Sequence, residues 1–485
     1  MNRGQLVKFF KRSGKASFVL TALLLTACAT HRSAKPAPVE LPAKWTAATV
    51  IDGAHVGVDW WQEFDDQRLD RLVRRVLESN TDVLTAANRL RKARLEAASV
   101  ATNMTPDVSL RAGVDWSTDP DAARRMRSGG GGVTAALSYD LDIGGKLAAE
   151  RDSANGNVNR VESDGDWTRL KMVKESLEKY WKLGFLSESL NFAGESLAHA
   201  KKTLAIVQAR YRAGDVSEID VVAAQQKVIA DGIAIDKLNE QVLKNRNALA
   251  ILMGNPPETP VEIPDRLSSI PLKPVAAGLP ADVIHRRADV RAAEWLLRQT
   301  LSQIDIARAR LYPSLTLTGS VGTSSVNLER FLSNPIANLG LAVALPFFQW
   351  NQTQLQIKVS QAEFDAAAQA FRKTVYVALR EVEDELTISA ELAREETQLL
   401  EKLETARKAA HLAKVRFFAG QTAVQPWLQT QQSFTEAKEA LAQIHLDRLT
   451  NRAALLVALG GSMENTTAID REASGAYDCR QSSRG

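Results

Sequence analysis

The sequence contains two copies of one unit, and this duplication limits the possible folds more than any other feature. Arg210–Gly214 (RYRAG) returns 206 positions later as Arg416–Gly420 (RFFAG). Thr105–Leu110 (TPDVSL) likewise matches Tyr312–Leu317 (YPSLTL). Matched segments in the same order indicate a repeated structural unit. We expect each copy to contain a helix, two strands, a very long helix, a turn and a final helix.

The prolines show where long helices can form. None of the 16 lies between Pro120 and Pro256, or between Pro346 and Pro426. An interior proline removes a helix hydrogen bond, so these Ala-, Leu- and Glu-rich stretches favour helices. We expect continuous helices over 146–212 and 352–418, roughly 100 Å long at ~1.5 Å per residue. Because a bilayer core is only about 30 Å thick, such helices must project into an aqueous compartment.

Both long stretches carry a coiled-coil seam, with apolar residues spaced alternately by three and four. The seam of the first copy comprises Leu183, Leu186, Leu190, Ala193, Leu197, Ala200, Leu204, Val207 and Tyr211. The seam of the second comprises Leu392, Leu399, Leu403, Ala406, Ala410, Ala413 and Phe417, and is broken only by Glu396. This spacing predicts packing along a neighbouring helix, and the alanines predict a close approach.

Four short segments alternate between apolar and polar or small residues, as half-buried strands do. We expect strands at 107–117, 132–143, 314–322 and 337–347, near the 9–11 residues of a transmembrane strand. The run Gly129–Gly132 has no Lys-Ser/Thr partner and leads into a strand, so we interpret it as a loop and not as a phosphate site. Alternation alone is equally compatible with a soluble antiparallel sheet packed on helices.

The N-terminal residues predict secretion. Five basic residues precede the apolar run 18–25, which is too short to span a membrane, and Leu25–Cys28 (LTAC) resembles the lipobox of bacterial lipoproteins. We expect a lipid on Cys28; an unmodified cysteine in an ordinary signal is the alternative. The next residue is Ala29 and not the aspartate that retains lipoproteins at the inner membrane, which favours the outer membrane. Four strands cannot close a barrel, so a membrane role requires oligomerisation, and three copies would supply 12 strands.

The expected organisation has six parts. They are a signal peptide at 1–27, a lipidated linker at 28–58, the first repeat at 59–255, a proline-rich link at 256–280, the second repeat at 281–461 and a flexible tail at 462–485. Without the signal, 56 basic residues stand against 57 acidic ones, so electrostatics give no reason to expect nucleic acid as a partner. The only other cysteine is Cys479, so lipidation of Cys28 leaves no intramolecular disulfide.

Several motifs resemble the outer-membrane efflux (TolC-like) family, in particular the lipidated branch similar to the OprM and NodT-type factors of tripartite efflux systems. The resemblance covers roughly Trp60 to Gly461. The motifs that carry it are Trp60–Asp66 with Leu69 and Leu72, Asn80–Asp82, His285–Glu294, Ala307–Leu315 and Leu379–Asp384.

The resemblance implies a mainly α-helical protomer with a membrane β-barrel. Three copies would form a 12-stranded barrel continuous with a long α-helical barrel in the periplasm of a Gram-negative bacterium. It also implies a periplasmic adaptor (membrane fusion protein), an inner-membrane RND-type transporter and outer-membrane lipid as partners. No cofactor is implied beyond the covalent lipid on Cys28.

Two groups of site residues follow from the resemblance. The adaptor-contact tips would be Arg210, Tyr211, Ala213, Gly214, Arg416, Phe417, Ala419 and Gly420, and the periplasmic gate would be Asp220, Gln425, Trp427, Gln429 and Gln432. Many relatives carry an aspartate and a basic residue where this chain has Gln429 and Gln432, which predicts a less ionic gate closed by neutral hydrogen bonds and by packing of Trp427. Ala288 and Trp350–Asn351 replace a proline and glycines usual in the family, so the local backbone geometry at these sites is open to change while the family fold is still expected.

Signatures of catalysis are missing from the sequence. The six histidines include no pair at i,i+4, and no Gly-x-Ser-x-Gly motif occurs. Glu381, Glu383 and Asp384 fall on a family helix motif and are interpreted as structural or lumen-facing charges. The sequence therefore favours a non-enzymatic exit duct of an efflux pump for small toxic compounds or metal ions. The alternatives are the duct of a type I protein-secretion system and a non-conducting coiled-coil envelope lipoprotein.

Overall fold

The computed structural model describes most of the chain between Val39 and Gly461. The described residues are 39–46, 57, 59–118, 127–257, 259–264, 267–270, 272, 278, 280–325, 335–345 and 349–461. The chain divides into the units Met1–Val39 and Glu40–Gly485, and all elements below belong to the second. The predicted signal peptide, Cys28 and the predicted tail lie outside the described residues.

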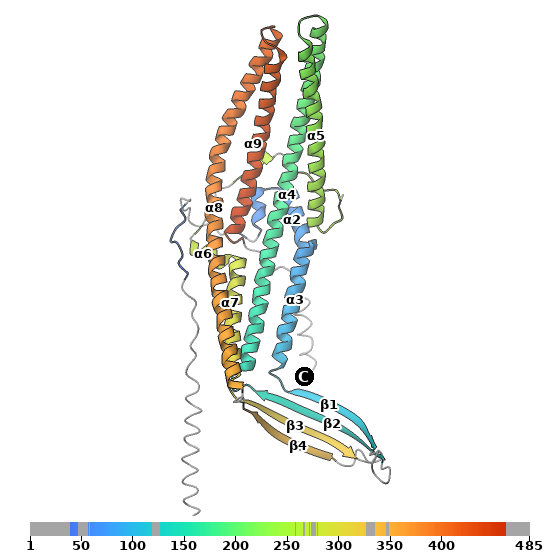
Figure 1. The fold of residues 1–485 in the computed structure, drawn as a ribbon, viewed down its shortest axis with the longest axis vertical. Coiled ribbons are helices and arrows are strands. Elements are labelled where there is room, and N and C mark those ends of the chain that lie inside the picture. Colours follow the sequence, from blue (N-terminus) through green and yellow to red (C-terminus); the bar gives the residue numbers. More distant parts are fainter. Residues whose placement is uncertain are drawn as a thin grey trace, which may run out of the picture. The chain divides into compact units, whose positions relative to one another are not determined.

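The two repeats have the same order of elements (Figure 1). The first comprises η2 (Trp60–Phe64), α2 (Gln67–Ser79), α3 (Thr81–Thr102), β1 (Asp107–Thr118), β2 (Arg127–Leu141), α4 (Lys146–Arg212) and α5 (Glu218–Leu252). After the link with η3 (Leu267–Ser269), the second comprises α6 (Pro280–Arg286), α7 (Ala288–Ala309), β3 (Ser314–Ser325), β4 (Pro335–Ala344), α8 (Trp350–Phe418) and α9 (Val424–Ala458). No helix in these ranges is both long and apolar enough to cross a membrane.

The long helices α4 and α8 contain 67 and 69 residues. α4 has the predicted bounds, whereas α8 begins at Trp350, two residues before the predicted start. The cause lies in the family departure at this site: α4 follows the left-handed Gly145 (φ 70°), whereas Trp350 and Asn351 already form the first turn of α8 after Gln349 (φ −105°). The second repeat therefore enters its helix without a left-handed residue.

The four strands form one antiparallel sheet in the order β1-β2-β3-β4. The run Gly129–Gly132, expected as a loop, belongs to β2, so that expectation was wrong. Gly129 and Gly130 pair with Trp116 and Asp115 of β1, while Gly131 and Gly132 pair with Ser325 and Ser324 of β3. Backbone hydrogen bonds to strands on both sides outweigh the weak strand propensity of glycine.

The sheet keeps large apolar side chains exposed within the described part of the chain. They include Val108, Leu110, Val114, Val321, Leu339, Leu341 and Val343, and Leu339 is 84% exposed. Figure 1 shows the sheet beyond the ends of the helices and not covered by them. This excludes the alternative of a sheet packed on helices of the same chain. β1 and β4 are its outer strands, each with one unpaired edge among the described residues.

The main hydrophobic core lies where η2, α2, α4, α5 and α9 meet. The family motif at Trp60–Asp66 supplies much of it: Trp60, Trp61 and Phe64 are buried. The rings of Phe64 and Trp181 meet edge to face with centroids 4.8 Å apart. Tyr180 Oη donates to Asp66 Oδ2 at 2.8 Å. The motif therefore marks the packing of the first repeat around α4.

A short N-terminal segment is held against the second repeat by one tryptophan. Trp45 is buried among Val283, Val382 and Leu455 from α6, α8 and α9. Its Nε1 donates to the carbonyl of Gly278 at 2.9 Å, and the amide of Thr46 donates to Glu383 Oε1 at 2.5 Å. Residues 40–46 are therefore fixed on the helical part of the chain.

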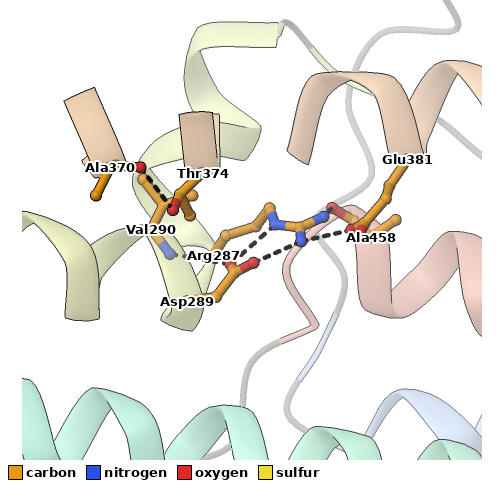
Figure 2. Close-up of polar contacts among 7 residues, drawn as sticks. All are labelled: Arg287, Asp289, Val290, Ala370, Thr374, Glu381 and Ala458. Carbon is orange, nitrogen blue, oxygen red and sulfur yellow. Dashed lines mark hydrogen bonds and ion pairs between the residues drawn. The ribbon is translucent and has the colours of Figure 1, made fainter. Parts of the chain in front are cut away.

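The buried Arg287 joins three helices of the second repeat (Figure 2). Its guanidinium donates to both carboxylate oxygens of Asp289 at 3.0 and 2.7 Å, to Glu381 Oε2 at 2.7 Å and to the carbonyl of Ala458 at 3.1 Å. It also lies 5.4 Å from the ring of Trp167 on α4. Burial alone would lower the pKa of Arg287, but its bonds to Asp289 and Glu381 raise it above the ordinary value. Arg287 therefore stays charged and links α7, α8 and α9.

Replacing Arg287 should destabilise the chain strongly. Arg287→Met leaves Asp289 and Glu381 without their cation, which typically costs about 3–5 kcal/mol. The matched control is Arg298→Met on α7, because Arg298 pairs with Glu294 at 2.6 Å and the two side chains are 54% and 42% exposed, and exposed pairs contribute about 0–1 kcal/mol. The measurement is the urea midpoint of the helical circular dichroism signal in detergent. Equal midpoints for the two variants would contradict the role of Arg287.

The family departure at Ala288 predicts a stabilising substitution. Ala288 is the first residue of α7, and Arg287 before it has φ −64° and ψ 127°, a conformation that a following proline tolerates. Ala288→Pro should therefore keep the fold and add about 0.4–1 kcal/mol. Ala292→Pro, one turn further, should cost about 3 kcal/mol by removing a helix hydrogen bond. Thermal unfolding tests both; a melting temperature that falls as far in Ala288→Pro as in Ala292→Pro would refute this view of the helix start.

Candidate functional site

The hairpins α4–α5 and α8–α9 carry all the predicted tip and gate residues. In α4 the buried positions form two rows, Leu186, Ala193, Ala200 and Val207, and Ser189, Ser196 and Thr203. The predicted seam members Leu190, Leu197 and Leu204 are only half-buried. One predicted row is thus confirmed, whereas the other row is mixed: Leu183 is buried, its three leucines are half-buried and Tyr211 is 44% exposed. Because α4 contacts α5 and α9 at once, its buried face is wider than a two-helix seam and includes small hydroxyl residues.

The break in the second seam is a polar contact between helices. Glu396 on α8 is half-buried at the seam position. Its carboxylate accepts from Arg448 on α9 and lies 3.3 Å from Nε2 of His445. The other members of this seam are half-buried or buried, and α8 packs against α9. The charged residue therefore fixes the alignment of α8 with α9 instead of interrupting their packing.

The two predicted tips are closed by the same turn. Gly214 and Gly420 have φ of 82° and 74° and follow the C-caps Ala213 and Ala419. Asp215 N donates to the carbonyl of Arg210 at 2.9 Å, and Gln421 N donates to that of Arg416 at 3.0 Å. These bonds define a glycine-terminated helix end that an L-residue would strain. The duplication thus extends to the hydrogen bonds of the turns.

The structure brings residues of the two tips together within one chain. Arg210 Nη1 donates to the carbonyl of Phe417 at 2.9 Å, and its guanidinium lies 4.8 Å from the Phe417 ring centroid. Phe417 is fully buried and stacks near Trp427 with centroids 5.2 Å apart. We name this group, with Val207, Ala224, Val424 and Leu428, the tip cluster. It joins the end of the first long helix to the second hairpin.

The predicted gate residues take different roles. Asp220 caps its own helix, since its Oδ2 accepts from Ser217 N and Oγ at 3.1 and 2.7 Å. Its Oδ1 also accepts from Val424 N at 3.4 Å. Burial alone would raise the pKa of Asp220, but the bonds from Ser217 and Val424 hold it below its ordinary value. Trp427 belongs to the tip cluster, whereas Gln425, Gln429 and Gln432 are exposed on α9.

A charged cluster near Gln432 was missed from the sequence. Lys227 Nζ on α5 donates to Asp231 Oδ1 and to Gln432 Oε1 on α9, each at 2.5 Å. Ser196 Oγ on α4 donates to Asp231 Oδ2 at 3.0 Å. We call these four residues the Lys227 cluster. The i,i+4 spacing of Lys227 and Asp231 was a visible signal of a helical ion pair, but nothing in the sequence places Gln432 beside it.

Carboxylates surround this cluster on α9. Gln432 Nε2 donates to Glu436 Oε1 at 2.9 Å. Burial raises the pKa of Glu439, and Glu436 and Asp231 act in the same direction while Lys227 opposes them. Lys438 pairs with Glu195 of α4 at 3.0 Å. The contact between the hairpins is therefore polar and partly ionic below the tip cluster. No group of three or more potential metal ligands occurs among the described residues.

Comparison with known proteins gives consistent relatives over nearly the whole chain. The chain is 27% identical over 467 residues to the pyoverdine export outer membrane protein OpmQ of Pseudomonas aeruginosa, covering 93% of this chain and 97% of that protein. It is 25% identical over 458 residues to nodulation protein T of Rhizobium leguminosarum bv. viciae, covering 93% and 94%. The crystal structure of the Campylobacter jejuni CmeC outer membrane channel matches its fold with a TM-score of 0.82 at 19% identity, over 92% of this chain and 97% of that one.

The family comparison follows the duplication seen in the structure. The model of the family described as outer membrane efflux protein matches residues 72–255 and, separately, residues 279–461. Each match spans one repeat, including its two strands and its long hairpin. With both repeats matched and the fold shared with solved outer-membrane channels, the chain belongs to the outer membrane efflux protein family.

Proposed function

We propose that this protein is the outer-membrane exit duct of a tripartite efflux pump and carries small toxic compounds or metal ions out of the cell. The observation that carries the proposal is the match of both repeats to the efflux family, together with a sheet whose apolar side chains are exposed. The relative OpmQ is named for pyoverdine export. In this proposal the chain is a conduit and performs no catalysis.

A trimer would satisfy the backbone of the sheet. In lipid, unpaired strand edges lack hydrogen-bond partners, so only closed barrels are stable there. Pairing β4 of one copy with β1 of the next satisfies both free edges, and three copies give 12 strands. The exposed valines and leucines would then face lipid, as in transmembrane barrels. A lipid on Cys28 would add an anchor near the same membrane.

The hairpins supply the periplasmic part of the proposal. The tips at Ala213–Gly214 and Ala419–Gly420 lie at the ends of the long helices opposite the strands (Figure 1). We propose that they meet a periplasmic adaptor, which connects the duct to an inner-membrane RND-type transporter. The Lys227 cluster and the tip cluster bond the two hairpins of one chain together, and we propose that they hold the gate closed.

Pore formation and drug susceptibility test the proposed function together. The purified full-length protein should form ion-conducting pores in planar bilayers, because the closed barrel leaves a wet lumen. Deletion of the gene should increase susceptibility to small toxic compounds, and the intact gene should restore resistance. A well-folded trimer without conductance would instead indicate a non-conducting envelope lipoprotein. Loss of protein secretion with unchanged susceptibility would indicate a secretion duct.

Removing the cation of the Lys227 cluster should open the gate. Lys227→Gln breaks bonds to Asp231 and Gln432, and a hydrogen bond to a charged group contributes about 1.5–3 kcal/mol. We therefore expect the open-to-closed ratio in single-channel recordings to rise at least about tenfold. The control is Lys237→Gln, which removes the same charge from an exposed site of α5 and should change nothing.

The same recordings test how ionic the closed state is. The side chains of Lys227 and Asp231 are only 16% and 10% exposed, so salt screens their attraction weakly. After correction for bulk conductivity, wild-type conductance should change little with ionic strength. A steep rise with salt, or an equal effect of the two lysine substitutions, would contradict this account of the gate.

A further inference from the structure

Each repeat carries an arginine followed by an aromatic residue at its tip, so two contacts between the arginine of one repeat and the aromatic residue of the other are conceivable. In the repeat alignment, Arg210 and Tyr211 correspond to Arg416 and Phe417. Within one chain only the combination of Arg210 with Phe417 is formed, at 2.9 Å to the carbonyl and 4.8 Å to the ring. The reciprocal contact would join Arg416 to Tyr211 and is not formed within the described part of the chain. Both residues nevertheless lie at helix ends that have the same hydrogen-bonded turn.

The carbonyl groups of Phe417 and Tyr211 have an equivalent backbone partner, but only that of Phe417 also accepts a hydrogen bond from an arginine. The carbonyl of Phe417 accepts from Gly420 N at 3.0 Å as well as from Arg210, while that of Tyr211 accepts from Gly214 N at 2.9 Å. The Arg416 side chain is exposed and forms no hydrogen bond or ion pair within the described ranges. A guanidinium is favoured at a helix C-terminus, where unpaired carbonyls carry partial negative charge. A matching donor and a matching acceptor are therefore both available.

The apolar surroundings show the same asymmetry. In the second repeat, Phe417 and Leu428 are 0% and 9% exposed because the first hairpin covers them. Their counterparts in the first repeat, Tyr211 and Val222, are 44% and 43% exposed. One tip is covered by a neighbouring hairpin, whereas the equivalent surface of the other tip is open. The exposed surface at Tyr211 and Val222 is therefore the first-repeat equivalent of the surface that the first hairpin covers at Phe417 and Leu428.

A closed ring of copies would place a second-repeat hairpin of the neighbouring copy beside the open first-repeat tip. We infer that Arg416 of one copy docks on the first-repeat tip of the next copy, donating to the Tyr211 carbonyl and covering the Tyr211 ring. The inference rests on the proposed trimer, in which hairpins of the first and second repeats alternate around the ring. Each hairpin then has one neighbour in its own chain and one in the next copy. The occupant of the open surface is a second copy of this chain.

The test uses full-length chains that each carry one new cysteine in a Cys479→Ser background. A copy with Tyr211→Cys and a differently tagged copy with Arg416→Cys are expressed together, so that only a contact between copies can join them. An arginine side chain reaches farther than the about 7 Å between Cα atoms that a disulfide can bridge, so a thiol-specific bis-maleimide cross-linker is used. It should give a linked species carrying both tags on denaturing gels. The matched control replaces Tyr211→Cys with Lys201→Cys, ten residues earlier on α4 and thus about 15 Å away along the helix, and should give no linked species.

The outcomes separate this inference from the proposed function. A trimer by native mass measurement with the linked species supports both. A trimer whose cysteines react with maleimide but do not link overturns the docking of Arg416 and leaves the duct standing. A monomer overturns both. If Arg416→Ala abolishes binding of the adaptor while the copies do not link, Arg416 serves the adaptor and the inference is wrong.

Discussion

The fold depends on neighbouring helices that pack along the sides of the long helices α4 and α8, because most helical stability in proteins comes from tertiary packing and not from local propensity. A helix of 67 residues buries its side chains only if neighbours accompany it along its whole length. α4 obtains this cover from α3 and α7 on the side of the strands and from α5 and α9 on the side of the tips. Since α7 and α9 belong to the other repeat, neither repeat is complete without its copy. The polar contacts agree: Gln303 of α7 donates to Ser153 of α4 at 2.8 Å.

This interlocking explains why charged residues occupy helix interfaces. Arg287, Glu396 and Asp231 each bond to a helix other than their own. Long helices with a repeating apolar seam can slide by a heptad at small energetic cost, whereas a buried ion pair has one satisfied position. We interpret these residues as fixing the alignment of the helices. Asp231 also belongs to the Lys227 cluster, which we propose holds the gate closed, so the same contact would serve helix alignment and gating.

The sequence predicted the backbone better than the contacts. Proline spacing and the duplication placed α4 and both tips, and alternation placed the four strands. The sequence analysis did not place Gly129–Gly132 in β2, because the pairing of β2 with β1 and β3 is a tertiary effect that overrides local propensity. The buried row Ser189, Ser196 and Thr203 of α4 was missed because a helix with two neighbours buries a wider face. Gln432 was predicted from the sequence as a gate residue, but its hydrogen bond with Lys227 depends on which helices lie side by side.

The central claim is that the open four-stranded sheet of one chain closes into a barrel with two further copies. An electron cryomicroscopy structure of the full-length lipidated protein in lipid nanodiscs tests it most directly. We predict threefold symmetry with β4 of each copy hydrogen-bonded to β1 of the next, and the side chains of Leu339 and Leu341 facing lipid. A monomeric sheet, a ring of another copy number, or strand edges covered by the protein's own helices would contradict the account.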